Sequence, residues 1–291
     1  MKYLLCRPNG GLNDVLCRVQ QCWAYCQKYE RILVVDTNVP VPECCFGYVF
    51  GDFFGLKEPD DNVKLELDDE MLATLQPLST TSPHLRGRLH EYYKEKGRWP
   101  VQYKFNFDID HEPDLLVLHA HGGGNHSVHA LEKLVLQSDV AELVRDRLSA
   151  LPKDYESIHV RNTDLTTDYE TFFDTIVGAV ANKNVLVCSD DVKCVAYAKA
   201  FFTDSNVFTL TDIPDMNGKS IHKHAPNKFK TNIDTMIDLL GLAMSSHIHF
   251  TGSLNNRGIH HVSGFTRLAR NLQRRPNTIR DLIGRENGQT H

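Results

Sequence analysis

The first candidate functional group in the sequence lies at the end of the strand-like run at 157–161. His159 and Arg161 are two positions apart, so both side chains lie on one face of the strand that this run predicts. Open α/β sheets bind their ligands at the carboxyl ends of such strands. An arginine there can bind a diphosphate through paired N–H donors, while a neighbouring histidine can bond a base or a ribose. The alternative for Arg161 is a salt bridge with Asp164.

A second candidate group is the glycine-rich segment at 10–14, between a predicted strand and a predicted helix. Glycines let a ligand approach the backbone closely, and a helix N-terminus favours an anion. We therefore expect Gly10, Gly11 and Asn13 to contact a diphosphate or a sugar. The alternative is a tight turn in which Asn13 or Asp14 caps the helix.

A third group is a histidine-rich segment around three glycines, and its histidines are His119, His121, His126 and His129. Such a set could bind zinc, but the segment contains neither a cysteine nor an acidic residue. We instead expect a ligand-facing loop in which His121 and His126 contact a sugar or an acceptor, and we expect no metal site.

The apolar pattern predicts the elements that position these groups. Strand, glycine turn, helix and strand follow one another over residues 2–36, as in a βαβ unit. A second α/β series begins at 157 and continues to 272. It consists of strands expected at 157–161, 184–188, 206–210 and 247–251, and of helices at 168–180, 192–202, 232–245 and 258–272. We therefore predict an α/β fold with two Rossmann-like domains, at 1–150 and 151–291.

The segment His159-Val160-Arg161-Asn162-Thr163-Asp164 resembles the His-Val-Arg-Arg-x-Asp motif of the fucosyltransferase superfamily. This superfamily includes α1,6-fucosyltransferases, nodulation fucosyltransferases and protein O-fucosyltransferases. Further blocks in the same order are similar to it, namely residues 10–14, 31–36, 185–191, 238–243 and 250–255. The resemblance covers residues 1–40 and 135–272, whereas 41–112 add nothing to it.

The resemblance implies a GT-B fold, in which two Rossmann-like domains face each other across a cleft. It also implies an inverting, metal-independent transfer of L-fucose from GDP-fucose to a hydroxyl of a glycan acceptor, without a cofactor. The N-terminal domain would then be on the acceptor side, and the C-terminal domain would bind the nucleotide sugar.

The resemblance also assigns roles to individual residues. Arg161 would bind the β-phosphate and stabilise the departing GDP. His159 and Asp238 would contact the guanine or the ribose. The other donor-binding positions would be Asp190 and Asp191 in the nucleotide pocket, and Gly252, Ser253 and Asn255 in a loop with amides directed at the phosphates.

Two departures from the family pattern leave alternatives open. Asn162 replaces the second arginine of the motif, and Leu254-Asn255 replaces a serine pair. The chain could therefore use another GDP- or NDP-deoxysugar, or it could be a catalytically weak sugar-nucleotide or glycan-binding protein. A metal-dependent hydrolase built on the histidine-rich loop is a third reading. An inverting attack needs a base for the acceptor hydroxyl, and Asp14 is the candidate.

Composition excludes several other classes of protein. The 291 residues carry a net charge of −5, which argues against nucleic-acid binding. No run approaches the roughly 20 apolar residues of a membrane span, and the N-terminus does not resemble a signal peptide. Eight cysteines lacking Cys-x-x-Cys spacing are expected to be buried thiols. These features predict a cytoplasmic protein whose partners are a nucleotide sugar and a glycan.

Overall fold

A computed structural model describes residues 1–38, 46–79, 105–163, 165–216, 219, 221–254 and 260–284. The chain forms two compact units, Met1–Leu134 and Val135–His291. The division therefore comes earlier than the boundary expected near residue 150. Helix α4 (Ser138–Leu148) explains the difference, because it packs against α8 (Lys228–Met244) and α10 (Pro276–Ile283) and so belongs to the second unit.

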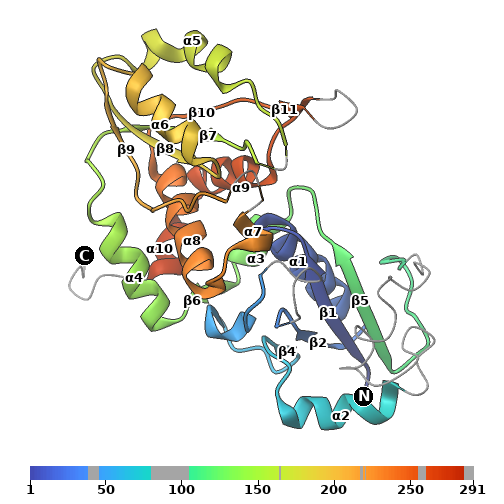
Figure 1. The fold of residues 1–291 in the computed structure, drawn as a ribbon. Helices are drawn as coiled ribbons and strands as arrows, with labels where there is room; N and C mark the ends of the chain where they lie inside the picture. Colours follow the sequence, from blue (N-terminus) through green and yellow to red (C-terminus); the bar gives the residue numbers. More distant parts are fainter. Residues whose placement is uncertain are drawn as a thin grey trace. The chain divides into compact units, whose positions relative to one another are not determined.

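The first unit contains a four-stranded sheet with the order β4-β2-β1-β5. Each neighbouring pair is parallel. The strands are β1 (Tyr3–Asn9), β2 (Ile32–Val35), β4 (Val63–Lys64) and β5 (Leu115–His121), labelled in Figure 1. The other elements are α1 (Leu12–Lys28), the 3-10 helix η1 (Phe50–Asp52), β3 (Phe54–Leu56), α2 (Asp69–Ser79) and α3 (Ser127–Leu131). Strand β6 (Leu134–Leu136) lies at the junction of the units.

Both faces of the first sheet are covered. All seven residues of β1 are buried, as expected for a parallel strand between two layers. Tyr3 and Leu5 pack with Leu75 of α2 in one apolar cluster. On α1, buried residues such as Val15 and Val19 recur at helical spacing, which gives this helix an apolar face.

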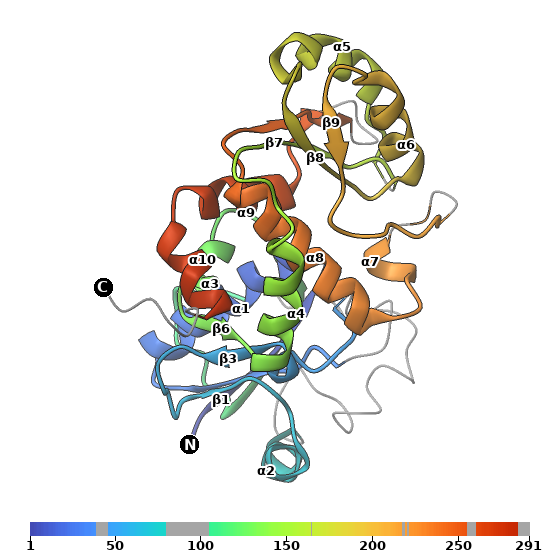
Figure 2. The same ribbon diagram turned by 90° about the vertical axis from the view of Figure 1, so that its left-hand side faces the viewer.

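The second unit is built on a sheet with the order β10-β7-β8-β9, in which neighbouring strands are again parallel. Figure 2 shows its elements from the side. The strands are β7 (Glu156–Val160), β8 (Asn184–Ser189), β9 (Asn206–Phe208) and β10 (Ile248–Phe250). The remaining elements are α5 (Tyr169–Val180), α6 (Val192–Phe201), α7 (Ile221–His224), the pair β11 (Ser253–Leu254) and β12 (His260–His261), and α9 (Gly264–Gln273).

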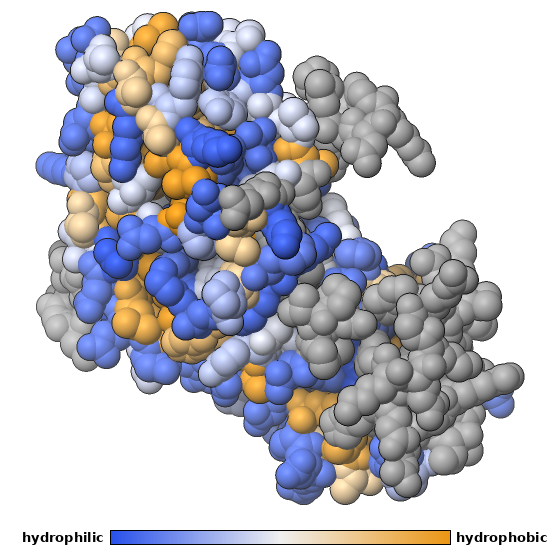
Figure 3. All heavy atoms as spheres, viewed as in Figure 1, coloured by the Kyte–Doolittle hydropathy of each residue, from blue (hydrophilic) through white to orange (hydrophobic). Residues whose placement is uncertain are grey.

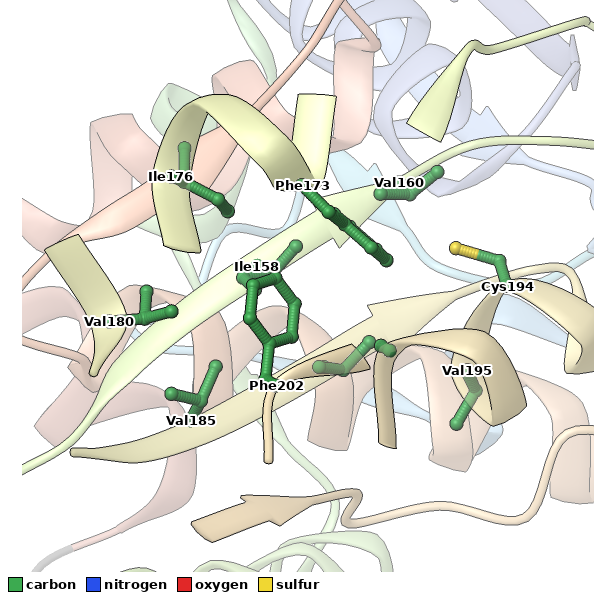
Figure 4. Close-up of a cluster of buried hydrophobic side chains, with 11 residues drawn as sticks. Ile158, Val160, Phe173, Ile176, Val180, Val185, Cys194, Val195 and Phe202 are labelled. Atoms are coloured by element: carbon green, nitrogen blue, oxygen red, sulfur yellow. The ribbon is translucent and has the colours of Figure 1, made fainter. Parts of the chain in front are cut away.

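An apolar layer joins helices α5 and α6 to strands β7 and β8. Phe173 of α5 and Phe202 at the end of α6 lie between the helices and the sheet, with their ring centroids 4.9 Å apart (Figure 4). Ile158 and Val160 of β7 point into the same cluster. Because side chains alternate along a strand, this packing directs His159 to the opposite face of the sheet.

The two sheets share a topological feature that determines where a ligand can bind. From β1 the chain continues to β2 on one side and later returns to β5 on the other side. From β7 it likewise continues to β8 and β9, and later returns to β10. The strand order therefore reverses beside β1 and beside β7. In open α/β sheets the binding crevice lies outside the carboxyl ends of the strands at such a reversal.

The surface is mixed in character. On the face shown in Figure 3, apolar residues form small patches between hydrophilic ones. None of the helices in the described ranges is both long enough and apolar enough to span a membrane.

Candidate functional site

The carboxyl ends of β7 and β10 form one edge of the second unit's candidate site. Phe250 of β10 pairs with His159 of β7, so Arg161 and Thr251 follow the two strands at neighbouring positions. Arg161 is half-buried, which leaves part of its side chain accessible. The predicted placement of Arg161 at the end of a strand is therefore confirmed, and the strand lies at the point where the strand order reverses.

His159 is enclosed by helix α9. Its side chain is 8% exposed, and Nδ1 lies 2.7 Å from the hydroxyl of Thr266. The ring centroid of Phe265 is 5.3 Å away. Burial, together with a smaller contribution from the nearby charge of Arg161, lowers the pKa of His159 to about 3. The imidazole is therefore neutral at physiological pH, and it connects β7 to the first turn of α9.

Asn162 connects the loops that follow β7 and β8. Its backbone N–H donates to Asp190 at 2.7 Å, and its side-chain amide donates to Asp191 at 2.7 Å. The Asn162 side-chain oxygen accepts from the N–H of Thr167 at 2.8 Å. The hydroxyl of Thr163 donates to the other oxygen of Asp190 at 2.5 Å. Three polar atoms of Asn162 thus hold protein groups, so this residue fixes the shape of the site.

A cavity of about 110 Å³ opens beside these loops. Its charged lining comprises Asp190, Asp191 and Asp215, with Lys193 opposite in sign. Asp191 also caps α6, because its carboxylate accepts from the N–H of Lys193 at 2.9 Å. The predicted pair Asp190 and Asp191 therefore does line a pocket, although part of its hydrogen-bonding capacity is used by Asn162 and Thr163.

Asp238 projects from α8 toward the end of the sheet. Thr211, which follows β9, donates its hydroxyl to both oxygens of Asp238, at 3.0 and 3.1 Å. The thiol of Cys188 in β8 lies 4.0 Å from the backbone oxygen of Asp238. Burial raises the pKa of Asp238 to about 7, and the Thr211 hydrogen bond opposes this shift. Near neutral pH this carboxyl can therefore either accept or donate a hydrogen bond.

The segment after β10 differs from the sequence-based expectation. Gly252 is half-buried, and Ser253 begins β11, which pairs antiparallel with β12. The helix expected from residue 258 begins only at Gly264, because the hairpin precedes it. Ser263 caps that helix by accepting a hydrogen bond from the N–H of Phe265 at 3.2 Å. The predicted contact Asn255 and the alternative salt-bridge partner Asp164 lie outside the described residues.

The first unit brings two sequence candidates together at the end of its own sheet. Asn9 of β1 pairs with His121 of β5, and the Asn9 amide lies 3.4 Å from Nε2 of His121. A Cβ atom on Gly122 would lie only 1.8 Å from the backbone oxygen of Asp14. Arg18 of α1 also donates a hydrogen bond to the backbone oxygen of His121. The histidine-rich segment therefore packs directly on the glycine loop.

The glycine loop itself is shaped by close packing. Gly10 has a φ of 109°, and a Cβ atom there would lie 2.6 Å from the Asp14 side chain. Its N–H donates to the side chain of Asn9 at 2.7 Å. Both the left-handed backbone and the contact with Asp14 therefore require glycine at this position.

The alternative in which Asn13 or Asp14 caps the helix is wrong. Gly11 occupies the N-cap of α1, without a side-chain cap. Asn13 is instead buried, and its side-chain oxygen accepts from the hydroxyl of Ser127 at 2.7 Å. Asp14 lies in the first turn of α1 and is half-buried. The glycine N-cap leaves the approach to the helix N-terminus uncovered by a capping side chain.

The remaining histidines of this segment are separated. His121 ends β5, His126 is the exposed N-cap residue of α3, and His129 lies 2.9 Å from the carboxylate of Glu132. Among the residues that the structure describes, no three His, Cys, Asp or Glu side chains are grouped as a metal site would require.

No protein-family model matches the sequence, and no curated protein is similar to it. Solved structures do match. Fucosyltransferase NodZ from Bradyrhizobium is 18% identical with a TM-score of 0.58, and the match covers 94% of each chain. NodZ alpha-1,6-fucosyltransferase soaked with GDP-fucose is 17% identical with a TM-score of 0.55, over 94% of this chain and 93% of that one.

A further match is POFUT1 in complex with GDP-fucose, at 12% identity and a TM-score of 0.53, over 98% of this chain and 96% of that one. The chain has the fold of these fucosyltransferases. The predicted α/β fold of the GT-B type, with parallel sheets in two Rossmann-like units, is thereby confirmed.

Within this fucosyltransferase fold, three residues of the site were not predicted from the sequence. Thr211 binds Asp238, Thr266 binds His159, and Ser263 caps α9. A serine before an amphipathic run is a recognisable capping signal, so Ser263 could have been found. The two threonines carry no such signal, because their contacts join segments that are far apart in the sequence.

Proposed function

We propose that this chain is an inverting glycosyltransferase that moves L-fucose from GDP-fucose to a hydroxyl of a glycan acceptor. The observation that carries the proposal is the position of Arg161. It follows β7 where the strand order of the second sheet reverses, in a fold shared with fucosyltransferases whose structures contain GDP-fucose. The second unit is then the donor-binding unit, and the first is the acceptor-side unit.

The proposed role of Arg161 follows from the charge that develops during transfer. When the bond to the sugar breaks, negative charge accumulates on the departing diphosphate. A guanidinium already held at the end of a strand stabilises that charge without first reorganising. Arg161 is therefore proposed as both a donor-binding and a catalytic residue.

The rest of the donor site is proposed from the surrounding side chains. His159 and Asp238 contact the guanine or the ribose, and the pocket beside Asp190 and Asp191 contributes to holding the nucleoside. The pocket supports this role because it opens at the ends of β7 and β8, next to Arg161. The loop residues Gly252, Ser253 and Asn255 are proposed to supply amide donors to the phosphates.

The acceptor and the sugar are proposed to contact the first unit. Gly10, Gly11 and Asn13 form the sugar- or diphosphate-facing loop, with His121 and His126 on the adjacent segment. Asp14 is the proposed general base, since its carboxylate lies in the first turn of α1, next to the reversal between β1 and β5. No metal ion takes part in this scheme, so transfer is expected to persist in the presence of a chelator.

A second candidate function is a sugar-nucleotide-binding protein with little turnover. Asn162 favours it, because a side chain bonded to Asp191 and Thr167 stands where the family motif has a second cation. Binding without release of GDP from GDP-fucose would support this alternative. Release of GDP, faster with an acceptor glycan, would support the transferase.

The first experiment is a thermal-shift comparison of GDP, UDP, ADP and GDP-fucose. A ligand that binds only the native state raises the melting temperature, so GDP compounds should do so selectively.

Arg161→Ala should abolish transfer and weaken GDP binding while leaving the circular dichroism spectrum unchanged. Arg147→Ala, on an exposed part of α4, is the matched control. Near-normal transfer by Arg161→Ala would show that the assignment is wrong.

A further inference from the structure

Helix α9 contains a half-buried arginine, Arg267, and one of its side-chain nitrogens has an unusual environment. Nε of Arg267 is buried and has no hydrogen-bond partner within the described part of the chain. No ion pair to Arg267 is found among those residues either. A buried donor without a partner loses its interaction with water and regains nothing in return. Such an atom is best explained by a ligand that binds there.

The position of Arg267 places it beside the proposed donor site. It directly follows Thr266, whose hydroxyl lies 2.7 Å from His159. The backbone N–H of Arg267 donates to the oxygen of Ser263 at 3.1 Å, so the residue belongs to the first turns of α9. Side chains on an α-helix lean toward its N-terminus, which directs this guanidinium over the turn that begins at Ser263. That end of α9 contacts β7 through Thr266 and His159, two residues before Arg161.

The motif after β7 provides few positive charges for a diphosphate. A diphosphate carries more than one negative charge, yet the motif after β7 offers a single cation, because Asn162 is neutral and bonded to Asp191. The loop after β8, which is bonded to Asn162, contributes two carboxylates, Asp190 and Asp191. A second positive group must therefore come from a different element. The N-terminus of α9 also carries a partial positive charge, which favours an anion there.

Resting on the proposed function, we propose that Arg267 is the second cation of the donor site and binds the diphosphate together with Arg161. Arg267 replaces, from helix α9, the charge that Asn162 does not provide. Arg270 lies farther along the same helix, and Arg274 is its C-cap residue. Arg270 is placed over the ring of Phe250, 4.9 Å from its centroid, so it has a separate contact.

The test compares ligands that differ only in phosphate, with GDP, GMP and guanosine titrated calorimetrically into the wild-type chain and into Arg267→Met. We expect Arg267→Met to weaken GDP binding about tenfold or more, as for the loss of a charge-assisted contact, and to leave guanosine binding unchanged. Arg267→Lys should recover part of the GDP affinity. Arg274→Met, which removes an exposed charge at the C-terminal end of the same helix, is the control and should bind GDP within about twofold of wild type.

A purely structural role predicts a different result. In that case Arg267→Met would lower the melting temperature without ligand and would weaken guanosine and GDP equally. Unchanged GDP binding by Arg267→Met would overturn this inference alone, leaving Arg161 and the proposed function intact. A wild-type chain that binds no GDP would overturn the proposed function, and this inference with it. If Arg267→Met does not fold, Arg267→Gln removes the charge while keeping a polar side chain, and GDP affinity equal to wild type in that variant would also overturn it.

Discussion

The side-chain amide of Asn162 donates a 2.7 Å hydrogen bond to the carboxylate of Asp191, and so ties the loop after β7 to the loop after β8. The same side chain accepts from the N–H of Thr167. The fucosyltransferase motif that this segment resembles has an arginine at this position. Here the position is occupied by Asn162, which links the loops after two strands by hydrogen bonds. The geometry around Arg161 therefore depends on a neutral residue that need not touch a ligand.

Removing the Asn162 side chain should lower the stability of the folded chain. Asn162→Ala deletes two hydrogen bonds and leaves Asp191 with fewer partners, so we expect the free energy of unfolding to fall by about 1–3 kcal/mol. Urea unfolding measures the change. Asn206→Ala is the matched control, because its amide donates to Asn184 at an exposed position of the same sheet. Equal losses for the two variants would contradict the proposed link between the loops.

The contact between Gly122 and Asp14 should tolerate no side chain. In Gly122→Ala the added carbon would lie 1.8 Å from a backbone oxygen, so the chain must shift. We expect a loss of about 3 kcal/mol in the free energy of unfolding, as for an overpacked site. Gly178→Ala, where a Cβ atom meets nothing within 4 Å, should instead gain about 0.5–1 kcal/mol. Wild-type stability of Gly122→Ala would refute this close approach.

The neutral His159 should make stability depend on pH. Its pKa is about 3 in the folded chain, below the usual value of 6.5, so the unfolded chain binds the extra proton first. The stability from His159 is fully present above pH 6.5 and is lost as the pH falls toward 3. Between pH 7.5 and 5.0 the expected loss is about 2 kcal/mol. In His159→Gln this part of the pH dependence should be absent. If the free energy of unfolding of His159→Gln fell with pH as steeply as that of the wild type, His159 would not be the cause.

Asp238 should act in the opposite direction. Its pKa is raised from 3.8 to about 7, so the folded chain holds a proton that the unfolded chain has released. Stability from this group is present below pH 4 and is lost as the pH rises through 7. Asp238→Asn keeps an acceptor for Thr211 and cannot ionise. We expect its stability relative to wild type to rise by about 2 kcal/mol between pH 5 and pH 8. A pH-independent difference between the two proteins would argue against a carboxyl that is protonated in the folded chain.

Sequence periodicity predicted the elements better than the contacts between them. The βαβ order around 10–14 and the strand before Arg161 follow from apolar spacing, which depends mainly on local burial. Helix α5 likewise begins at Tyr169, one residue after the predicted start at Asp168, which is its N-cap. Helix α9 was placed six residues early, since the apolar pattern did not separate the β11–β12 hairpin from the helix.

The side-chain network of the site could not be read from the sequence. His159 bonds Thr266, which is 107 positions away in the sequence. Asn162, in the loop after β7, bonds Asp191, in the loop after the neighbouring strand β8. Such contacts depend on the register of parallel strands and on the placement of helices beneath them. The resemblance suggested Arg161 as a ligand-binding position, which remains a prediction, but it could not show that its neighbour Asn162 bonds a carboxylate.

The strand order of the sheets has a consequence for how the chain is made on the ribosome. In the first unit β1 emerges first, but its partner β5 is synthesised only after β2, β4 and α2. In the second unit β10 likewise follows β8, β9 and α8 before it can pair with β7. In both halves the strand on the far side of the reversal is therefore synthesised late. A nascent chain can pack much of each core while β1 and β7, which precede Gly10 and Arg161, still lack one of their two neighbouring strands, so the proposed sites are completed only near the end of each half.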